Sequence, residues 1–520
     1  MNSLTIVLIA VVFYILGYRF YGKKLAKVFE LSADKEVPSK KFYDGIDYVP
    51  ARHWLMLFGH HFASIAGAGP ILGPVIACAI WGWLPCAIWL IIGAIVIGAV
   101  HDFSSLMISL RHQGKSIADV SESVMGRAVR VAFAGFIWLS LILVMAVFAA
   151  VAGKTLQEAP QIVIPTFGLI PLAIFIGILI YRYKMNLGFA SILGFAILFL
   201  LIITGVKFPV KIWNAKIWTF ILLIYAYFAA IIPVNILLQP RDYLSTSILF
   251  FGILVGFVGL LITHPVIKAP AFTGFMSAKG PLFPMLMVII ACGAISGFHS
   301  LVSSGTTSKQ LPSESDAQKI GYGAMLAESA LSILALLSVS AGLSWATYLS
   351  LMSEKGWIYT FGEGFGRVTK PVLLGLGSFV GMTMLNAFVL TTLDTATRIT
   401  RYIGEELFKI RNRFLSTGII VFLAGLLATG AYKKIWPVFG ASNQLVAAIA
   451  LLVVSVYLMN QRKRAIYTLL PSIFMFAVTI TALILEAIDF YKTGVYYLFS
   501  ISLILLLLAF FTIYHSLKKS

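Results

Sequence analysis

Fifteen long apolar segments follow one another along this chain, and they constrain its fold more than any other feature. Each could form a membrane-crossing helix of about 17–25 residues, and they fall at 3–22, 54–81, 83–110, 131–153, 161–181, 189–206, 216–238, 245–263, 283–304, 321–349, 371–393, 416–431, 437–459, 465–487 and 494–514. Only 11% of the residues are charged, against about 25% in soluble domains. Because lipid offers no partners to backbone groups, such segments must be helical. We therefore predict an all-α polytopic membrane protein with about fifteen transmembrane helices.

Basic residues gather in alternate loops between these segments. With the N-terminus outside, the cytoplasmic loops hold 27 of the 39 Lys and Arg residues, as the positive-inside rule requires. This pattern predicts a cytoplasmic C-terminus. It also accounts for the net charge of +19 without nucleic acid, since no basic face carries interleaved aromatic residues. Segment 3–22 has no preceding basic residue and no following cleavage site, so we expect a retained helix rather than a signal peptide.

The segment at 54–81 carries residues that a helix facing only lipid would not need. Between Gly59 and Pro70 it holds imidazoles, a hydroxyl and helix-breaking residues. Glycine and proline at membrane depth favour a helix that opens, and opened helices hold substrates and ions in transporters. Close packing of small residues is the alternative. We expect a transport site to be lined here by His60, His61, Ser64, Gly67 and Gly69.

Ionisable side chains in membrane segments are costly and by default indicate function. His101 and Asp102 could form a proton relay, because imidazole titrates near neutral pH and a carboxylate can fix its tautomer. A structural polar pair near the headgroups is the alternative. Glu328, two turns into its segment, is a second candidate proton carrier or a hydrogen-bonded structural acid. Cys78, Cys86 and Cys292 lack paired spacing, so we expect small core residues rather than disulfides or metal ligands.

Two prolines bracket an amide near the end of segment 216–238. Pro233 would free a carbonyl in the preceding turn, and Asn235 could line the gap that results. We predict an opened helix at Asn235 and interpret Arg241 as a topological anchor.

Hydroxyl groups are concentrated between Gly293 and Ser308, around a single imidazole. Six predicted spans separate this segment from 54–81, so the two enter the membrane from opposite sides. Hydroxyls beside free carbonyls suit a dehydrated cation, whereas hydrogen bonding between helices is the alternative. The predicted substrate or ion ligands are His299, Ser300, Ser303, Ser304, Thr306 and Thr307.

A further polar group ends segment 371–393. Asn386 lies deep enough to face a cavity, and Asp394 could carry a proton. Asp394 and Arg398 are four residues apart and could simply pair on one helix face.

These motifs together resemble the carbon starvation protein A (CstA) family. The resemblance rests on Gly59–Pro70, His101–Phe103, Leu238–Leu244, Gly297–Gln310, Thr391–Arg398 and Trp436–Gln444. It implies uptake of peptides or pyruvate, driven by protons, across the inner membrane during carbon starvation. It also implies a LeuT-like inverted repeat of five helices, as in the amino acid–polyamine–organocation transporters.

In that fold, 54–81 would be the first, broken helix, 216–238 the sixth and 283–304 the eighth. The hydroxyls of the eighth helix would face Ala63 to Gly67, where some relatives bind sodium. The resemblance further implies a transporter core at 54–400, preceded by a helix and a basic loop at 1–53 and followed by peripheral helices at 401–520.

We therefore expect a secondary transporter of a small carboxylated solute, coupled to protons or sodium and working without a cofactor. A metal-dependent membrane enzyme using His60, His61, His101 and His299 is one alternative, and a channel or nutrient sensor is another. Against the enzyme, adjacent histidines on a helix point about 100° apart, and the chain has no His-x-x-x-His spacing. Whether the histidines bind a metal stays open at this point.

Overall fold

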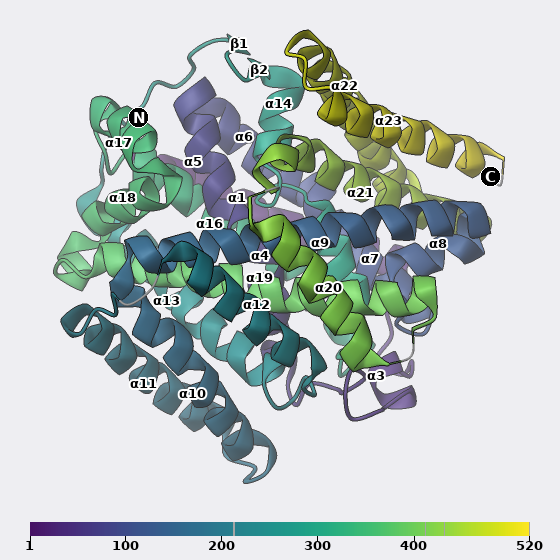
Figure 1. Cartoon of the computed structure of the whole chain (residues 1–520), viewed down its shortest axis with the longest axis horizontal. Helices are drawn as coiled ribbons and strands as arrows, with labels where there is room; N and C mark the ends of the chain where they lie inside the picture. Colours follow the sequence, from purple (N-terminus) through teal and green to yellow (C-terminus); the bar gives the residue numbers. More distant parts are fainter. Residues whose placement is uncertain (212–213, 411, 431, 519–520) are drawn as a thin grey trace.

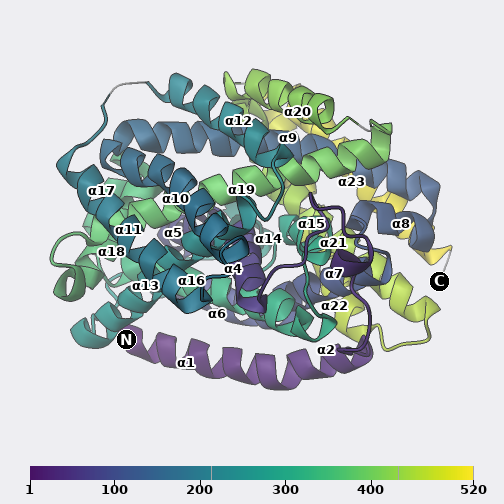
Figure 2. The same ribbon diagram turned by 90° about the horizontal axis from the view of Figure 1, so that it is seen from below.

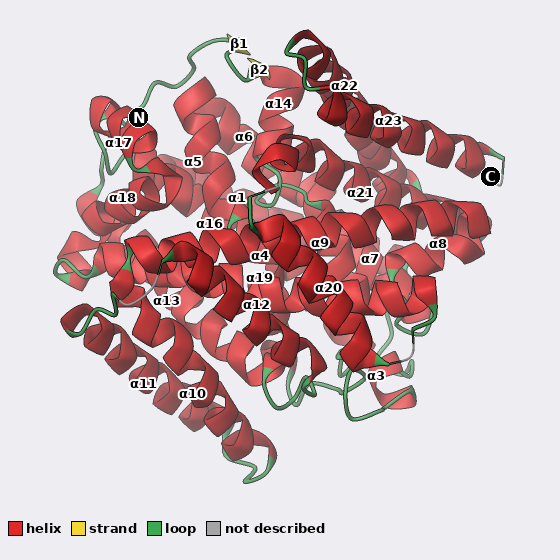
Figure 3. Cartoon of the chain, in the orientation of Figure 1, coloured by secondary structure: helices red, strands yellow, loops and turns green. Residues whose placement is uncertain are grey.

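The computed structural model describes residues 1–211, 214–410, 412–430 and 432–518, with the side chains at 181, 187 and 432–437 left out. The Trp436–Pro437 part of the last sequence motif is therefore outside the described side chains. Most of the described chain is helical (Figure 3), and its one strand pair is β1 (Met276–Ser277) with β2 (Gly280–Pro281).

The helices are numbered in chain order (Figure 1). Their bounds are α1 Ser3–Leu16, α2 Lys23–Val28, α3 Pro38–Lys41, α4 Trp54–Ala66, α5 Gly69–Trp81, α6 Trp83–Gly93, α7 Ala99–Arg111, α8 Ile117–Met125, α9 Arg127–Glu158, α10 Val163–Tyr181, α11 Leu187–Lys207, α12 Ala215–Ile231, α13 Leu238–Thr263, α14 Leu282–Ile289, α15 Gly297–Gly305, α16 Gly323–Ser340, α17 Trp345–Glu354, α18 Gly356–Leu373, α19 Gly377–Phe408, α20 Arg413–Ala428, α21 Tyr432–Asn460, α22 Ile466–Lys492 and α23 Tyr496–Leu517.

Twelve helical stretches of the described chain are long and apolar enough to cross a membrane. Two further apolar helices, α12 and α20, are shorter. The predicted segment at 283–304 is interrupted, because α14 and α15 are separated by non-helical backbone. The prediction of a polytopic helical membrane protein is confirmed, but the number of fifteen membrane helices is not.

The predicted opening in segment 54–81 is present between α4 and α5. Gly67 has a φ of +46°, a backbone conformation that favours glycine over other residues. Pro70 then occupies the first turn of α5, where its missing N–H costs no helical hydrogen bond. The break thus follows directly from the local sequence.

A second broken helix, formed by α14 and α15, runs antiparallel to the first. The ring nitrogens of His60 and His61 reach the hydroxyls of Thr306 and Thr307, whereas Gly69 lies against Cys292. Residue numbers therefore increase along one broken helix where they decrease along the other, which is the relationship expected between equivalent helices of an inverted repeat. The assignment of the sixth helix to 216–238 is therefore wrong, because α12 is continuous and the broken helix lies at 282–305.

Two 32-residue helices, α9 and α19, pass over the broken pair and run antiparallel to each other. Arg130 donates to the carbonyl of Glu406, while Thr400 donates to the sulfur of Met145 further along. Several elements lie at the edges: α1 along one side (Figure 2), and the α10–α11 and α22–α23 pairs at opposite margins (Figure 1). The broken helices therefore occupy the centre.

The polar, glycine-rich stretch at 350–370 lies between two predicted membrane segments and is typical of a loop, but that interpretation is wrong because α17 and α18 make it helical. Its glycines read as loop residues, but they allow close packing between helices. A Cβ on Gly364 would come 2.4 Å from the carbonyl oxygen of Ser338, and one on Gly366 would come 2.2 Å from the hydroxyl of Ser378. Small residues at such contacts let helix backbones approach each other.

Candidate functional site

The first histidine pair joins the two broken helices. His61 Nδ1 lies 2.8 Å from Thr307 Oγ1, and His60 Nε2 lies 3.2 Å from Thr306 Oγ1. All four side chains are buried. The predicted pairing of the two segments is present, although its register differs from the expected one: the threonines meet the histidines rather than Ala63 to Gly67.

His60 also pairs with a carboxylate from a third element. Its Nδ1 lies 2.5 Å from Asp242 Oδ2 on α13, and both side chains are fully buried. Gln310 approaches the other ring nitrogen at 3.3 Å. A carboxylate at this distance from one ring nitrogen fixes the orientation of the imidazole.

The break itself lies against α19. Ser64 Oγ is 2.9 Å from Thr395 Oγ1, and Thr392 donates to the carbonyl oxygen of Ser64 at 3.2 Å. A Cβ on Gly67 would come 3.0 Å from Thr392 Oγ1. Hydroxyls of α19 therefore satisfy part of the backbone that the break leaves open.

A second buried cluster links α7, α15 and α16. Asp102 accepts from two imidazoles, with Oδ1 at 3.0 Å from His101 Nδ1 and Oδ2 at 3.0 Å from His299 Nδ1. His299 Nε2 is 3.4 Å from Glu328 Oε2. His101, Asp102, His299 and Glu328, which come from separate sequence segments, thus form one connected group of fully buried side chains.

One metal-compatible group occurs among the described residues, and it is not the set of four histidines. Ligand atoms of Cys292, His299 and Glu328 lie within 4.8 Å of one another. His60 instead pairs with Asp242, and His101 with Asp102. Cys78 and Cys86 are buried, as expected of core residues, whereas Cys292 is only partly buried.

Arg241 is a buried ion-pair partner, and its interpretation as a topological anchor is wrong. Its guanidinium pairs with Asp394, which also accepts from Tyr225 Oη at 2.7 Å. The expected pairing of Asp394 with Arg398 is wrong too, because α13 supplies a guanidinium in closer contact.

Arg398 instead reaches Asp47, in the segment between α3 and α4. Arg398 Nη1 lies 2.6 Å and Arg401 Nη2 2.8 Å from the Asp47 carboxylate. Burial raises the pKa of Asp47, but the two guanidinium groups outweigh this effect and hold it well below its ordinary value of 3.8. Asp47 thus links the segment between α3 and α4 to α19.

The segment around Asp47 also binds the ends of the central helices. Ala51 N donates to the carbonyl of Gln310 at 2.9 Å, and Val234 N donates to that of Ile46 at 3.0 Å. Gln239 Nε2 donates to the carbonyl of Val49 at 3.2 Å. The segment therefore crosses the end of the molecule at which α4 begins and α15 ends.

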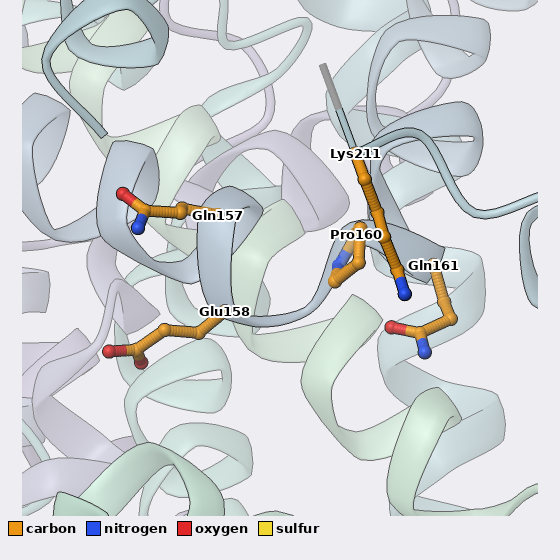
Figure 4. Close-up of a pocket in the computed structure, with 5 residues that line it drawn as sticks. All are labelled: Gln157, Glu158, Pro160, Gln161 and Lys211. Carbon is orange, nitrogen blue, oxygen red and sulfur yellow. The ribbon is translucent and has the colours of Figure 1, made fainter. Parts of the chain in front are cut away.

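A shallow surface cleft of about 410 Å³ lies at the junction of α9 and α10 (Figure 4). Lys211 and Gln161 line one side, and Gln157 and Glu158 the other, with Pro160 between them. None of these residues belongs to the buried clusters, so the cleft is separate from the candidate site.

A family model described as "Carbon starvation protein CstA" matches residues 2–362 and 347–482. The chain belongs to the CstA family. Relatives that are 33% identical include "Peptide transporter CstA" of Campylobacter jejuni, which covers 92% of this chain and 79% of its own, and the same-named protein of Bacillus subtilis, with 92% and 89%. "Pyruvate/proton symporter BtsT" of Escherichia coli is also 33% identical, over 93% and 81%.

Solved structures show the same fold as this CstA-family chain. A manganese transporter of Eremococcus coleocola, crystallised with an aromatic bis-isothiourea compound, gives a TM-score of 0.56 at 12% identity, covering 92% of this chain and 99% of its own. MhsT in complex with L-phenylalanine gives 0.54 at 13% identity, with 89% and 98% covered. The LeuT-like fold is confirmed, and the chain is a membrane transporter rather than an enzyme.

Other predicted site residues of this CstA-family chain lie apart from the break. Asn235 is in a turn between α12 and α13, so the predicted opened helix there is wrong: the first helix has already ended at Ile231. Asn386 donates to Thr166 Oγ1 of α10 at 2.7 Å. Ser300 bonds within its own helix, and Ser304 accepts from the backbone N–H of Ile117.

Several contacts of the site escaped the sequence interpretation. Asp242, Gln310, Thr392 and Thr395 lie in the quoted motifs, yet none was singled out as a ligand. The position of Asp242 directly after Arg241, in a segment with few charges, is the sequence signal that could have indicated it. The roles of the threonines depend on which helix faces the break, and spacing does not show that.

Proposed function

We propose that this chain is a proton-coupled symporter for a small carboxylated solute, pyruvate or a short peptide, in the inner membrane. The observation that carries the proposal is the antiparallel pair of broken helices with buried imidazoles and hydroxyls between them. The names of the relatives in Escherichia coli and Campylobacter jejuni support the two solute classes. Residues 54–400 would form the core, between a first helix with basic loop at 1–53 and peripheral helices at 401–520, with the N-terminus outside.

The solute would bind between α4, α15 and α19, which pack against one another. Three buried polar atoms in this region have no hydrogen-bond partner among the described residues: His61 Nε2, Ser303 Oγ and Thr391 Oγ1. Unpartnered buried polar groups are costly unless a ligand satisfies them. The N-terminus of α5, at Gly69, adds the positive end of a helix dipole for a carboxylate.

His60 and Asp242 would carry the coupling proton. Asp242 Oδ1 has no hydrogen-bond partner among the described residues, and His60 contacts only Asp242, Thr306 and Gln310 through its ring nitrogens. Asp394 is less suited, because the guanidinium of Arg241 already neutralises it. Glu328 faces an imidazole and a thiol, which is a set of side chains typical of a metal site rather than of a proton carrier.

Uptake into proteoliposomes tests the proposal. Labelled pyruvate and labelled dialanine would be offered with an inward proton gradient, with that gradient collapsed by a protonophore, and with a sodium gradient alone. We expect gradient-driven accumulation of at least one solute only when protons flow inward. An absence of uptake of both solutes under every gradient would contradict the proposal.

Two variants separate binding from coupling. Asp242→Asn should abolish accumulation driven by protons but retain exchange of labelled for unlabelled solute, because exchange needs no net proton movement. His61→Ala should lose both. If Asp242→Asn accumulates solute like the unmodified chain, the proton site lies elsewhere.

A further inference from the structure

The side chains of Cys292, His299 and Glu328 meet beside the break in the first broken helix. Cys292 lies in the non-helical link between α14 and α15, His299 near the start of α15, and Glu328 on α16. Their ligand atoms lie within 4.8 Å of one another. A thiol, an imidazole and a carboxylate are the side chains that bind Zn²⁺ in proteins.

The imidazole is already oriented as a metal ligand would be. His299 Nδ1 hydrogen-bonds Asp102 Oδ2 at 3.0 Å, so its Nε2 points toward Glu328. Metal-binding histidines almost always make this second hydrogen bond to a carboxylate or carbonyl, because it fixes the tautomer and the ring plane. Asp102 is itself held by His101 at 3.0 Å.

The distance between the two harder ligands also fits. Two atoms that each lie about 2.1 Å from a tetrahedral zinc ion are about 3.4 Å apart. His299 Nε2 and Glu328 Oε2 are 3.4 Å apart, which is long for a direct hydrogen bond. The sulfur of Cys292 lies within 4.8 Å of both atoms, which places a third ligand on the same side.

Glu328 provides the independent evidence for a ligand. It is fully buried, and neither of its carboxylate oxygens has a hydrogen-bond partner among the described residues. Its one charged neighbour is His299 Nε2 at 3.4 Å, so the carboxylate keeps unused acceptor capacity in a place where that is costly. The surrounding set of Cys292, His299, Glu328, Asp102 and His101 contains two carboxylates, two imidazoles and a thiol but no Lys or Arg, so it offers metal ligands and no permanently charged cation.

We infer that Cys292, His299 and Glu328 form a binding site for a thiophilic divalent cation, with Zn²⁺ as the best match. Three protein ligands leave a fourth position for water or another small ligand, and the thiol releases its proton on binding. A cation bound to these ligands would link α15 to α16 next to the helix break. The inference concerns binding alone and does not depend on which solute the chain carries.

Metal binding to the full-length chain in detergent tests the inference. The purified chain, stripped with a chelator, would be dialysed against Zn²⁺ for metal analysis, and against Co²⁺ for absorption spectra, since thiolate ligation gives a charge-transfer band. We expect about one Zn²⁺ per chain. Cys292→Ser should lose the band and bind at least tenfold more weakly, and Glu328→Gln should also bind at least tenfold more weakly. Cys86→Ser, a buried cysteine that bonds the carbonyl of Gly82, is the matched control and should bind normally.

Protection of Cys292 from alkylation is a second measurement, and it needs no substitution at the three proposed ligands. In a chain with Cys78→Ser and Cys86→Ser, Zn²⁺ should slow alkylation of the remaining thiol at least tenfold, as followed by mass spectrometry. Unchanged alkylation, or equal Zn²⁺ binding by the unmodified, Cys292→Ser and Glu328→Gln chains, would overturn the inference. Failure here leaves the transport proposal standing, because metal binding and solute uptake are measured separately.

Discussion

Asp47 and Arg398 lie 351 positions apart in sequence and 2.6 Å apart in space. The carboxylate comes from the polar segment before the first broken helix, and the guanidinium comes from α19. Arg398 also donates to the carbonyls of Ala229 and Ile232, at 2.7 and 2.6 Å. Through these hydrogen bonds, Arg398 joins three parts of the chain at the end where α4 begins and α15 ends.

Removing the Asp47 charge should destabilise the protein in a pH-dependent way. Asp47→Asn leaves the buried guanidinium of Arg398 without a charged partner and Arg401 with Glu405 alone, a change that costs about 3 kcal/mol in comparable buried pairs. The pKa of Asp47 is lowered by folding, so its stabilising effect is full above its ordinary pKa of 3.8 and is lost as the pH falls below that value. The gap in Tm between the two chains should stay constant from about pH 7 to 5 and shrink below about pH 4. The control is Asp34→Asn, because Asp34 lies on an exposed loop. Asp44→Asn is unsuitable as a control, because Asp44 accepts a hydrogen bond from the backbone of the same segment. A gap that does not change with pH would contradict the assignment.

Arg241 and Asp394 should behave as a unit. Replacing either one alone leaves the other charge buried and should cost about 3–5 kcal/mol, whereas replacing both with apolar residues of similar volume should recover most of the loss. We expect Arg241→Met and Asp394→Leu each to lower the Tm in detergent, and the double variant to lie closer to the unmodified chain. A double variant as unstable as the sum of the two would show that the ion pair is not the relevant contact.

Gly69 should tolerate no side chain. A Cβ at this position would come 2.2 Å from Cys292 Sγ and 2.6 Å from its Cβ, so Gly69→Ala should reduce the yield of folded protein. Combining it with Cys292→Gly removes both obstructing atoms and should restore folding. Gly135→Ala, where no atom lies within 4 Å, is the control and should fold normally. Size-exclusion profiles of the solubilised variants would check all three, and equal yields of Gly69→Ala and Gly135→Ala would contradict the packing described.

Ser64 and Thr395 should be coupled across the helix break. Removing one hydroxyl leaves the other buried without its partner, which costs about 1–3 kcal/mol, whereas removing both is close to neutral. We therefore expect Ser64→Ala and Thr395→Val each to lower the Tm, and the double variant to be more stable than the less stable single one. Strict additivity of the two effects in a double-mutant cycle would argue against the hydrogen bond.

The local features of the fold were readable from the sequence, and the contacts across it were not. The break after α4 follows from Gly67, Gly69 and Pro70 alone. The pairing of Arg241 with Asp394 cannot be predicted in the same way, because the two residues are 153 positions apart. Helical spacing instead offers Asp394 a nearer partner, Arg398. The glycines of α18 misled for a related reason: glycine favours loops, but it also permits close helix packing, and only the neighbouring helix decides between the two.

The distance in sequence between Arg241 and Asp394 has a consequence for how the protein is made. At a synthesis rate of about 5–20 residues per second, the 153 positions that separate them take about 8–30 s to translate. During that interval α13 has been synthesised with a guanidinium whose counter-ion does not yet exist, and a charge at membrane depth is costly. The ion pair between Arg241 and Asp394 therefore cannot form until α19 has been synthesised. Completion of the fold around α13 thus depends on a helix that is made much later in translation.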